Sequence, residues 1–241
     1  TEVDASARVV RLADDTSLSF AKLVFATGSR SIRPPLPGMD LQGVLTFRNA
    51  DDAAMIAGAA GNGSRAVVIG GGLLGIEAAY GLAKGGSRVT LVHLMDRLME
   101  RQLDEVAAGM LERKLATYGV DILLEAETER VEGEGRVEAV ILKDGRRLPA
   151  DLVVVAIGIR PNAELARAAG LNVGRGIVVG DLLQTSEPGI YAIGECAEHR
   201  GVCYGLVEPG YEQARVLAEH LCGGEASYAG SVVSTNLKVS G

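Results

Sequence analysis

The residues with the clearest chemical meaning form a glycine motif between an apolar run and a helical pattern. Gly70, Gly72 and Gly75 have the spacing G-x-G-x-x-G, and the apolar residues 67–69 precede them. Such glycines allow a tight turn, a bare backbone against a pyrophosphate and close packing of helix on strand. The helix dipole then favours a phosphate at the helix start. The predicted dinucleotide contacts are Gly70, Gly71, Gly72, Leu73, Leu74 and Gly75. The alternative is a glycine-rich turn without a ligand.

A second candidate contact is His93, the last residue of the next predicted strand. In a dinucleotide-binding βαβ unit, an acidic residue here accepts the ribose 2′-OH of NAD, whereas an arginine accommodates the 2′-phosphate of NADP. Neutral His93 accepts one hydrogen bond, and protonated His93 favours phosphate. Arg97 and Arg101 are further candidates for the 2′-phosphate, with a solvated surface face as the alternative. These residues do not decide whether the nucleotide is NADH or NADPH.

The elements that must position these residues alternate between strands and helices. We predict strands at 22–27, 65–70, 87–93, 120–124, 151–157, 177–179 and 190–193, and helices at 49–59, 73–85, 104–118, 162–169 and 209–222. Strands at 3–12 and 16–20 are predicted to form one hairpin, and strands at 126–132 and 136–142 a second. A last strand is predicted at 231–239. Apolar strands end in Gly28 and in Gly158, each after a hairpin. Two Rossmann-like units, each with a hairpin insertion, would produce this pattern.

Composition narrows the classes of function. The 241 residues carry a net charge of −7, which disfavours nucleic acid and anionic membranes as partners. No apolar run approaches the roughly 20 residues that span a bilayer. The three cysteines and three histidines are too scattered for a metal site, so we expect no metal. A reduced, cytoplasmic setting is therefore expected, and a homodimer is compatible with the sequence.

Four motifs in a fixed order resemble one known family. They are Ala26-Thr27-Gly28-Ser29, Gly70-Gly71-Gly72-x-x-Gly75-x-Glu77, Ala156-Ile157-Gly158-x-Arg160-Pro161-Asn162 and Pro188-Gly189-Ile190-Tyr191-Ala192-Ile193-Gly194-Glu195-Cys196-Ala197. This set resembles the pyridine nucleotide–disulfide oxidoreductases, which are flavoproteins with two dinucleotide-binding domains. The resemblance implies an α/β fold, in which a Rossmann-like three-layer NAD(P)-binding domain is inserted in a partial FAD-binding domain of the same type. The implied boundaries are 1–40 and 160–229 for the FAD domain, 41–159 for the NAD(P) domain and 230–241 for the start of a C-terminal region.

A narrower likeness lies in residues 92–104 and 194–201. They resemble the flavin-containing part of assimilatory NAD(P)H nitrite reductases, or the similar component of assimilatory nitrate reductase. This likeness implies hydride transfer from NAD(P)H to FAD, with electrons passing to iron–sulfur and sirohaem centres elsewhere, and it favours NADH. The alternatives are a ferredoxin or rubredoxin reductase, a disulfide reductase, and a non-catalytic dinucleotide-binding module.

The resemblance also assigns roles to further residues. Glu77 would point toward the nicotinamide carboxamide, whereas the alternative is a charge that stabilises its helix N-terminus. Ile157 and Gly158 would border the bound nucleotide. Glu195, where the family usually has Asp, would bind the ribityl hydroxyls of FAD. The other implied FAD contacts are Ala26, Thr27, Gly28, Arg48 and Gly194.

The chain begins without methionine, in what reads as the middle of a strand, so we expect a fragment of a larger protein. The family's first glycine motif, which holds the FAD pyrophosphate, is not in this sequence. We therefore predict that the chain alone retains little or no FAD. The visible absorbance spectrum of the purified chain checks this, and stoichiometric bound flavin would contradict it.

Overall fold

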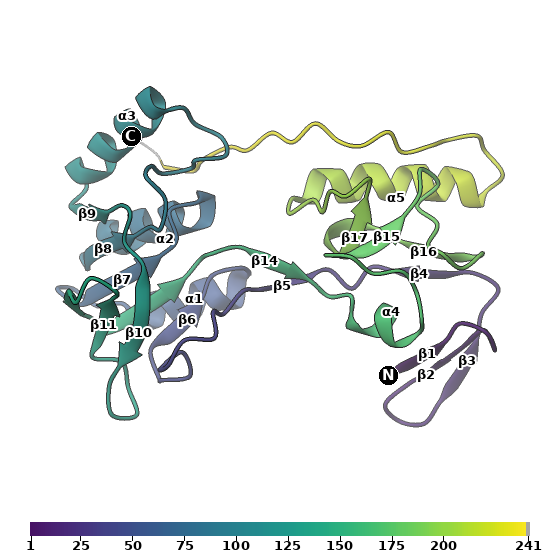
Figure 1. Cartoon of the computed structure of the whole chain (residues 1–241), viewed down its shortest axis with the longest axis horizontal. Helices are drawn as coiled ribbons and strands as arrows, with labels where there is room; N and C mark the ends of the chain where they lie inside the picture. The colour runs from purple at the N-terminus through teal and green to yellow at the C-terminus, as the bar shows by residue number, and fades with distance from the viewer. Residues whose placement is uncertain (240–241) are drawn as a thin grey trace. The chain divides into compact units, whose positions relative to one another are not determined.

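The computed structural model describes residues 1–239, which form two compact units (Figure 1). Unit 1 comprises Thr1–Arg30 and Ile159–Thr235, and unit 2 comprises Ser31–Gly158 with residues 236–239. The first crossing between units therefore lies near residue 30, ten residues before the position expected from sequence. Residues 236–239 belong to unit 2 by their contacts. The assignment of the units to FAD and NAD(P) stays a prediction.

Unit 2 is built on a five-stranded parallel sheet with the order β6-β13-β7-β8-β9. The strands are β6 (Val44–Thr46), β7 (Arg65–Ile69), β8 (Arg88–Val92), β9 (Val120–Leu123) and β13 (Leu152–Val155). The predicted βαβ unit is present, because α2 (Leu73–Lys84) joins β7 to the neighbouring parallel strand β8. β13 pairs with β7 on its other side, so the strand that ends in Ile157 and Gly158 lies next to the glycine motif.

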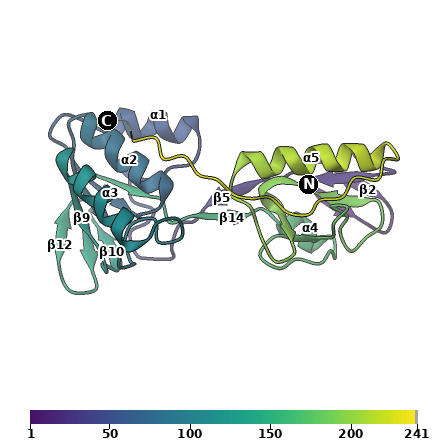
Figure 2. The same ribbon diagram turned by 90° about the horizontal axis from the view of Figure 1, so that it is seen from above.

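Alternation along the central strands divides unit 2 into three layers. Val68 and Val154 face a core shared with the helices, whereas Val67 and Val153 face a second core. The helical layer contains α1 (Ala50–Ala59), α2 and α3 (Glu105–Thr117). An antiparallel sheet of β10 (Thr128–Glu132), β11 (Ala139–Leu142) and β12 (Arg147–Pro149) covers the other face (Figure 2). The predicted α/β, three-layer arrangement is confirmed.

The helix starts in unit 2 follow from side-chain caps. Asn49 caps α1 through a capping box with Asp52, and Asp104 accepts a hydrogen bond from the N–H of Ala107 at the start of α3. Both starts agree with the sequence prediction. No helix within residues 1–239 is long and apolar enough to cross a membrane.

Unit 1 has one apolar core beneath short strands. Its strands are β1 (Glu2–Asp4), β2 (Val9–Arg11), β3 (Ser17–Ser19), β4 (Leu23–Phe25), β15 (Ile177–Val179), β16 (Ile190–Ala192) and β17 (Ala197–His199), with β5 (Ser29–Ser31) and β14 (Ile159–Pro161) pairing near the crossing. β16 runs parallel to β4, and β15 runs parallel to β17. The helices are α4 (Glu164–Ala168), the short 3₁₀ helix η1 (Gly194–Cys196) and α5 (Val207–Leu221).

Two sequence predictions about strands are wrong. The segment predicted as one strand over 3–12 forms two strands, because the backbone turns at residues 5–8, where Arg8 has a positive φ of 55°. Residues 231–239, predicted as a strand, have no regular secondary structure. No strand of the described chain pairs with this segment, and a strand without hydrogen-bonded partners is not stable by itself.

Arg65, the first residue of β7, forms an ion pair with Asp151, the residue before β13. The Arg65 guanidinium donates to both carboxylate oxygens of Asp151, and the Arg65 N–H donates to Oδ2 at 2.9 Å. These hydrogen bonds, first that of the Arg65 side chain, lower the pKa of Asp151 from 3.8 to about 2. Because the folded-state pKa is depressed, the stabilisation is present above about pH 4 and is lost as the pH falls through about 2.

We predict that Asp151→Asn lowers the free energy of unfolding at pH 7 by about 1 kcal/mol or less, because both side chains are partly exposed. Urea titrations at pH 7 and pH 3 measure the difference from wild type, which should shrink at pH 3. Asp121→Asn removes the same charge from an exposed position of β9 and serves as the control. A difference that grows on acidification would contradict the sign of this linkage.

Candidate dinucleotide-binding site

The glycine motif forms the turn between β7 and α2. Gly70 has a φ of +118°, and a Cβ there would overlap the Ala156 carbonyl of the neighbouring strand end. A Cβ on Gly75 would overlap the Gly70 carbonyl oxygen. These contacts explain two of the glycines by backbone packing alone: the turn requires Gly70, and the approach of α2 to β7 requires Gly75.

Gly72 differs from these two, because packing does not require it. Its backbone is extended, with φ −84° and ψ −176°, and a Cβ there would have nothing within 4 Å. It is the N-cap of α2, and no side chain caps this helix. The start of α2 therefore presents backbone N–H groups and open space. Such a helix N-terminus is suited to a phosphate group.

Glu77 lies one residue beyond the first turn of α2, which starts at Leu73 and contains no acidic residue in that turn. This position weakens the alternative that Glu77 is a charge that stabilises the N-terminus of its helix, because the dipole effect falls off within the first turn. The Glu77 carboxylate is half-buried and accepts the Lys238 N–H at 3.0 Å. Leu237 and Val239 pack on the same core as α2. This carboxylate thus accepts hydrogen bonds from N–H donors, the chemistry that a carboxamide would also offer.

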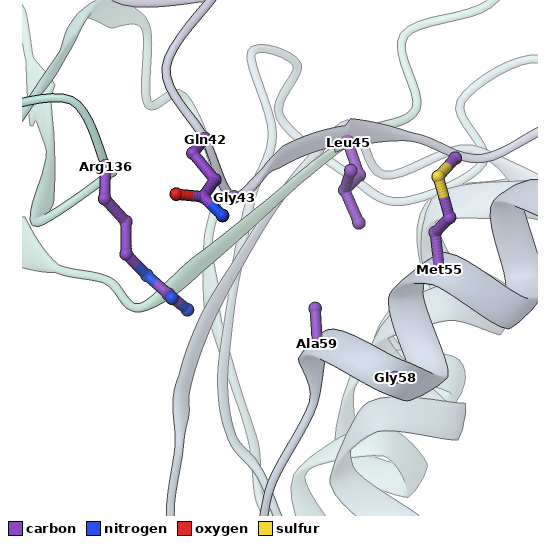
Figure 3. Close-up of a pocket in the computed structure, with 7 residues that line it drawn as sticks. All are labelled: Gln42, Gly43, Leu45, Met55, Gly58, Ala59 and Arg136. Carbon is purple, nitrogen blue, oxygen red and sulfur yellow. The ribbon is translucent and has the colours of Figure 1, made fainter.

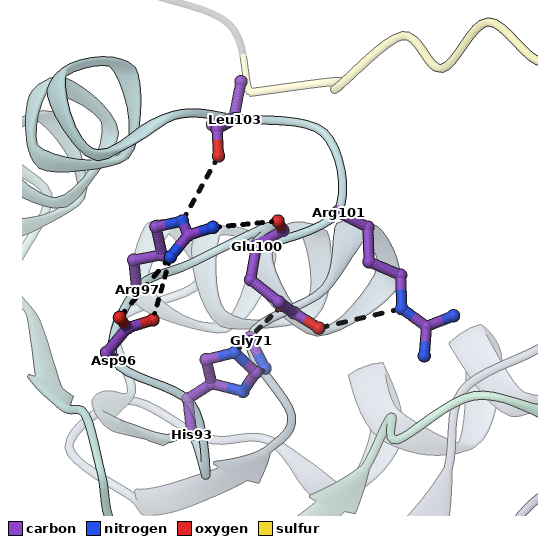
Figure 4. A network of polar contacts seen from close by, with 7 residues as sticks. All are labelled: Gly71, His93, Asp96, Arg97, Glu100, Arg101 and Leu103. Atoms are coloured by element: carbon purple, nitrogen blue, oxygen red, sulfur yellow. Dashed lines mark hydrogen bonds and ion pairs between the residues drawn. The ribbon is translucent and has the colours of Figure 1, made fainter.

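His93 lies against the glycine loop and is only 8% exposed. Its Nδ1 accepts the Gly71 N–H at 3.0 Å, and its Nε2 lies 3.2 Å from Oε2 of Glu100 (Figure 4). The Met99 N–H donates to the Gly71 carbonyl oxygen at 3.0 Å. The segment after β8 is therefore fastened to the glycine loop, and Glu100 is brought beside His93.

The two arginines predicted near the nucleotide have different surroundings. Arg97 is 30% exposed and donates to Asp96 and to the carbonyl oxygens of Glu100 and Leu103 (Figure 4). Its hydrogen bonds fix the segment around it. The Arg101 side chain is 84% exposed, and its Nε is 3.9 Å from Oε1 of Glu100.

Ile157 and Gly158 follow β13 at the carboxyl edge of the sheet, where the glycine loop also lies. Ile157 is 40% exposed, and the Gly158 carbonyl oxygen accepts the Ile32 N–H at 3.0 Å. Ligands of open α/β sheets bind outside this edge. Unit 2 thus brings the glycine loop, His93, Ile157 and Gly158 to one edge.

The FAD candidates of unit 1 follow two neighbouring parallel strands, β4 and β16. Thr27 and Asn162 form two hydrogen bonds, which we call the Asn162 clasp. Thr27 Oγ1 donates to the Asn162 carbonyl oxygen at 2.6 Å, and Asn162 Nδ2 donates to the Thr27 carbonyl oxygen at 2.9 Å. Gly28 has a φ of +64°, and Ala26 directly follows β4. The loop over residues 26–28 is therefore fixed by side-chain and backbone hydrogen bonds.

Glu195 lies in η1, directly after β16. Its Oε2 accepts a hydrogen bond from Ser29 Oγ at 2.9 Å. The Gly194 N–H donates to Oε1 of Gln213 at 2.6 Å, which ties η1 to the buried face of α5. Unit 1 thus brings the loop after β4 and the loop after β16 together through the contact between Ser29 and Glu195.

Arg48, unlike the other FAD candidates, belongs to unit 2, where it is a half-buried residue that follows β6. Unit 2 also has a surface hollow between β6 and α1 (Figure 3). It is lined by Gln42, Gly43, Leu45, Met55, Gly58, Ala59 and Arg136. None of the predicted site residues lines it, so the hollow is separate from the glycine-loop site.

Three residues of these sites were missed from the sequence: Glu100, Asn162 as the clasp of Thr27, and Gln213. The available signal for Gln213 was its spacing of four residues from Pro209 and from Leu217, which places it on the apolar face of the helix, where a polar side chain needs a partner. Asn162 lies in a motif that was recognised, without this role. Nothing in the spacing indicated Glu100, which follows His93 by seven residues.

The comparisons with known proteins agree with this geometry. Residues 1–219 match the family model described as pyridine nucleotide-disulphide oxidoreductase. The chain belongs to this family of oxidoreductases. Two relatives from Bacillus subtilis (strain 168) match over the whole chain: a nitrite reductase [NAD(P)H], 50% identical, and an assimilatory nitrate reductase electron transfer subunit, 45% identical. The chain spans about 30% of the length of these two relatives.

The fold is also similar to that of a solved structure. The ferredoxin reductase for the CYP199A2 system from Rhodopseudomonas palustris has a TM-score of 0.89 and is 33% identical. The match covers 95% of this chain and 59% of that chain. The resemblance inferred from the four motifs is therefore confirmed at the level of family and fold.

We predict that Gly75→Ala destabilises unit 2 by about 1–3 kcal/mol, because its methyl group would overlap the Gly70 carbonyl. The matched control is Gly81→Ala in the same helix, where a Cβ has open space and should stabilise by about 0.5–1 kcal/mol. Thermal unfolding of the two variants should give shifts of opposite sign. Equal shifts would show that the close approach does not constrain the turn.

Proposed function

We propose that unit 2 binds NAD(P)H through the glycine loop. The observation that carries this proposal is the start of α2, where Gly72 leaves an uncapped helix N-terminus and open space. The pyrophosphate would be held at the glycine loop by the backbone N–H groups of residues 72–75, since the N–H groups of Gly70 and Gly71 donate to Val92 and His93. Ile157 and Gly158 would border the nucleotide, and Glu77 would accept a hydrogen bond from the nicotinamide carboxamide.

We further propose that unit 1 contributes to an FAD site. A carboxylate and hydroxyls that are already hydrogen-bonded to each other, as in Glu195 and Ser29, suit the hydroxyl-rich ribityl chain. Residues 26–28 would approach the adenosine half of FAD. α5 starts without a side-chain cap, and its positive end would stabilise an anionic reduced flavin. When bound, NAD(P)H would supply a hydride and FAD would be its acceptor. The residues of this chain would bind and orient both.

The proposed role in the whole protein is the flavoprotein module of an assimilatory nitrite or nitrate reductase, in the cytoplasm. Its electrons would pass to iron–sulfur and sirohaem centres outside this chain. The names of the two Bacillus subtilis relatives, which match all of this chain, support this role. A ferredoxin-type electron acceptor is the second candidate, and the fold similarity to a ferredoxin reductase supports it.

The variant Gly72→Asp tests the nucleotide site without disturbing the fold. Any residue can adopt the extended backbone of Gly72, and Asp is a favoured N-cap, so the variant should be at least as stable as wild type. Its carboxylate would occupy the phosphate position and repel the pyrophosphate. We predict that NADH binds wild type and binds Gly72→Asp at least about tenfold more weakly, as measured by titration calorimetry.

Gly72→Asn is the matched control, because it has the same size and capping ability without the charge. It should bind NADH more tightly than Gly72→Asp. If wild type gives no binding heat with NADH or NADPH, the proposed function is wrong. If Gly72→Asp binds as wild type does, the nucleotide lies elsewhere.

A further inference from the structure

The hydrogen bonds of His93 define its tautomer. Because the Gly71 N–H is a donor, Nδ1 of His93 must accept and carries no proton. In the neutral ring the proton is then on Nε2, which donates to Oε2 of Glu100 at 3.2 Å. His93 therefore has no free acceptor atom for a ribose hydroxyl. It nevertheless occupies the strand end at which an acidic residue would accept the 2′-OH of NAD.

The acceptor beside the glycine loop is instead the carboxylate of Glu100. This side chain is 25% exposed, so it is partly removed from solvent and still accessible. A carboxylate offers about four acceptor positions, and the bond from His93 uses one of them. Oε1 is 3.9 Å from the exposed Arg101, a distance at which this ion pair is weak.

The backbone around Glu100 is held in place from two sides. The Met99 N–H binds the Gly71 carbonyl oxygen, and the Arg97 guanidinium binds the Glu100 carbonyl oxygen at 3.3 Å (Figure 4). Arg97 also donates to Asp96 and to the Leu103 carbonyl oxygen, so each of its three guanidinium nitrogens is in a hydrogen bond. The carboxylate thus stands beside the loop with little freedom, and the nearer arginine is occupied.

We propose that Glu100 reads the adenosine ribose and makes this site select NADH over NADPH. The carboxylate would accept the ribose 2′-OH and repel a 2′-phosphate. His93 is a positioning residue that orients Glu100 through Nε2. This inference rests on the proposed nucleotide site and adds the residue that discriminates between the two cofactors.

The test compares the dissociation constants of NADH and NADPH for the purified chain. Wild type should bind NADH at least about tenfold more tightly than NADPH, which corresponds to one charge-assisted hydrogen bond. Glu100→Gln keeps the size and removes the charge, so NADH should bind about tenfold more weakly and the preference should fall close to one. Glu105→Gln removes the same charge from an exposed position nearby and should leave both constants unchanged.

The variant His93→Asn separates the positioning of Glu100 by His93 from the effect of the Glu100 charge. Its side-chain oxygen can replace Nδ1 as acceptor for Gly71, but the donor to Glu100 is lost. NADH binding should weaken while NADPH remains the poorer ligand, because the Glu100 charge is still present. If the variant merely lost its fold, the binding of NADH and of NADPH would weaken equally.

A nitrogen-15 NMR spectrum of His93 in the wild-type chain provides a readout that needs no variant. The expected result is a proton on Nε2 and none on Nδ1. The opposite tautomer would overturn the inference, as would a wild type that prefers NADPH or a Glu100→Gln variant with unchanged preference. If wild type binds neither nucleotide, the proposed function fails instead, and the two failures are distinguishable.

Discussion

The candidate site depends on the two hydrogen bonds of Gly71. Its N–H is held by His93 and its carbonyl oxygen by Met99, so the loop after β7 and the loop after β8 form one rigid edge. A Cβ on Gly71 would lie 2.6 Å from the His93 ring and from Leu98. The glycine is needed here for close packing between loops, which in turn sets the tautomer of His93 and the place of Glu100.

The order of strands explains why segments far apart in sequence meet at this edge. β13 enters the sheet between β6 and β7, although 82 residues, including two helices, separate its start from the end of β7. The parallel pairing aligns the carboxyl ends of β7, β8 and β13. Gly70 follows β7, His93 follows β8, and Ile157 and Gly158 follow β13 after Ala156. α2 approaches the Gly70 carbonyl closely at its own residue Gly75, and no side chain caps the start of the helix, which leaves that start free for a ligand.

Local structure could be predicted from the sequence, whereas contacts between residues far apart in the chain could not. The glycine spacing and the apolar run before it predicted the βαβ unit, because each acts over a few residues. The three layers were implied by the resemblance that the four motifs carry. Glu100 could not be predicted, since its position depends on the hydrogen bond between Met99 and Gly71. The same reason hid the Asn162 clasp of Thr27, which joins residues 135 positions apart. The strand predicted at 231–239 failed because β-propensity gives no strand without a partner.

The most direct measurement is a crystal structure of this chain with NADH. The pyrophosphate is expected against the N–H groups at the start of α2, with the Gly72 Cα beneath it and the adenosine ribose hydroxyls on the Glu100 carboxylate. A pyrophosphate bound away from Gly72 would contradict the nucleotide site itself. A pyrophosphate at Gly72 with the ribose directed away from Glu100 would contradict the basis of cofactor selection.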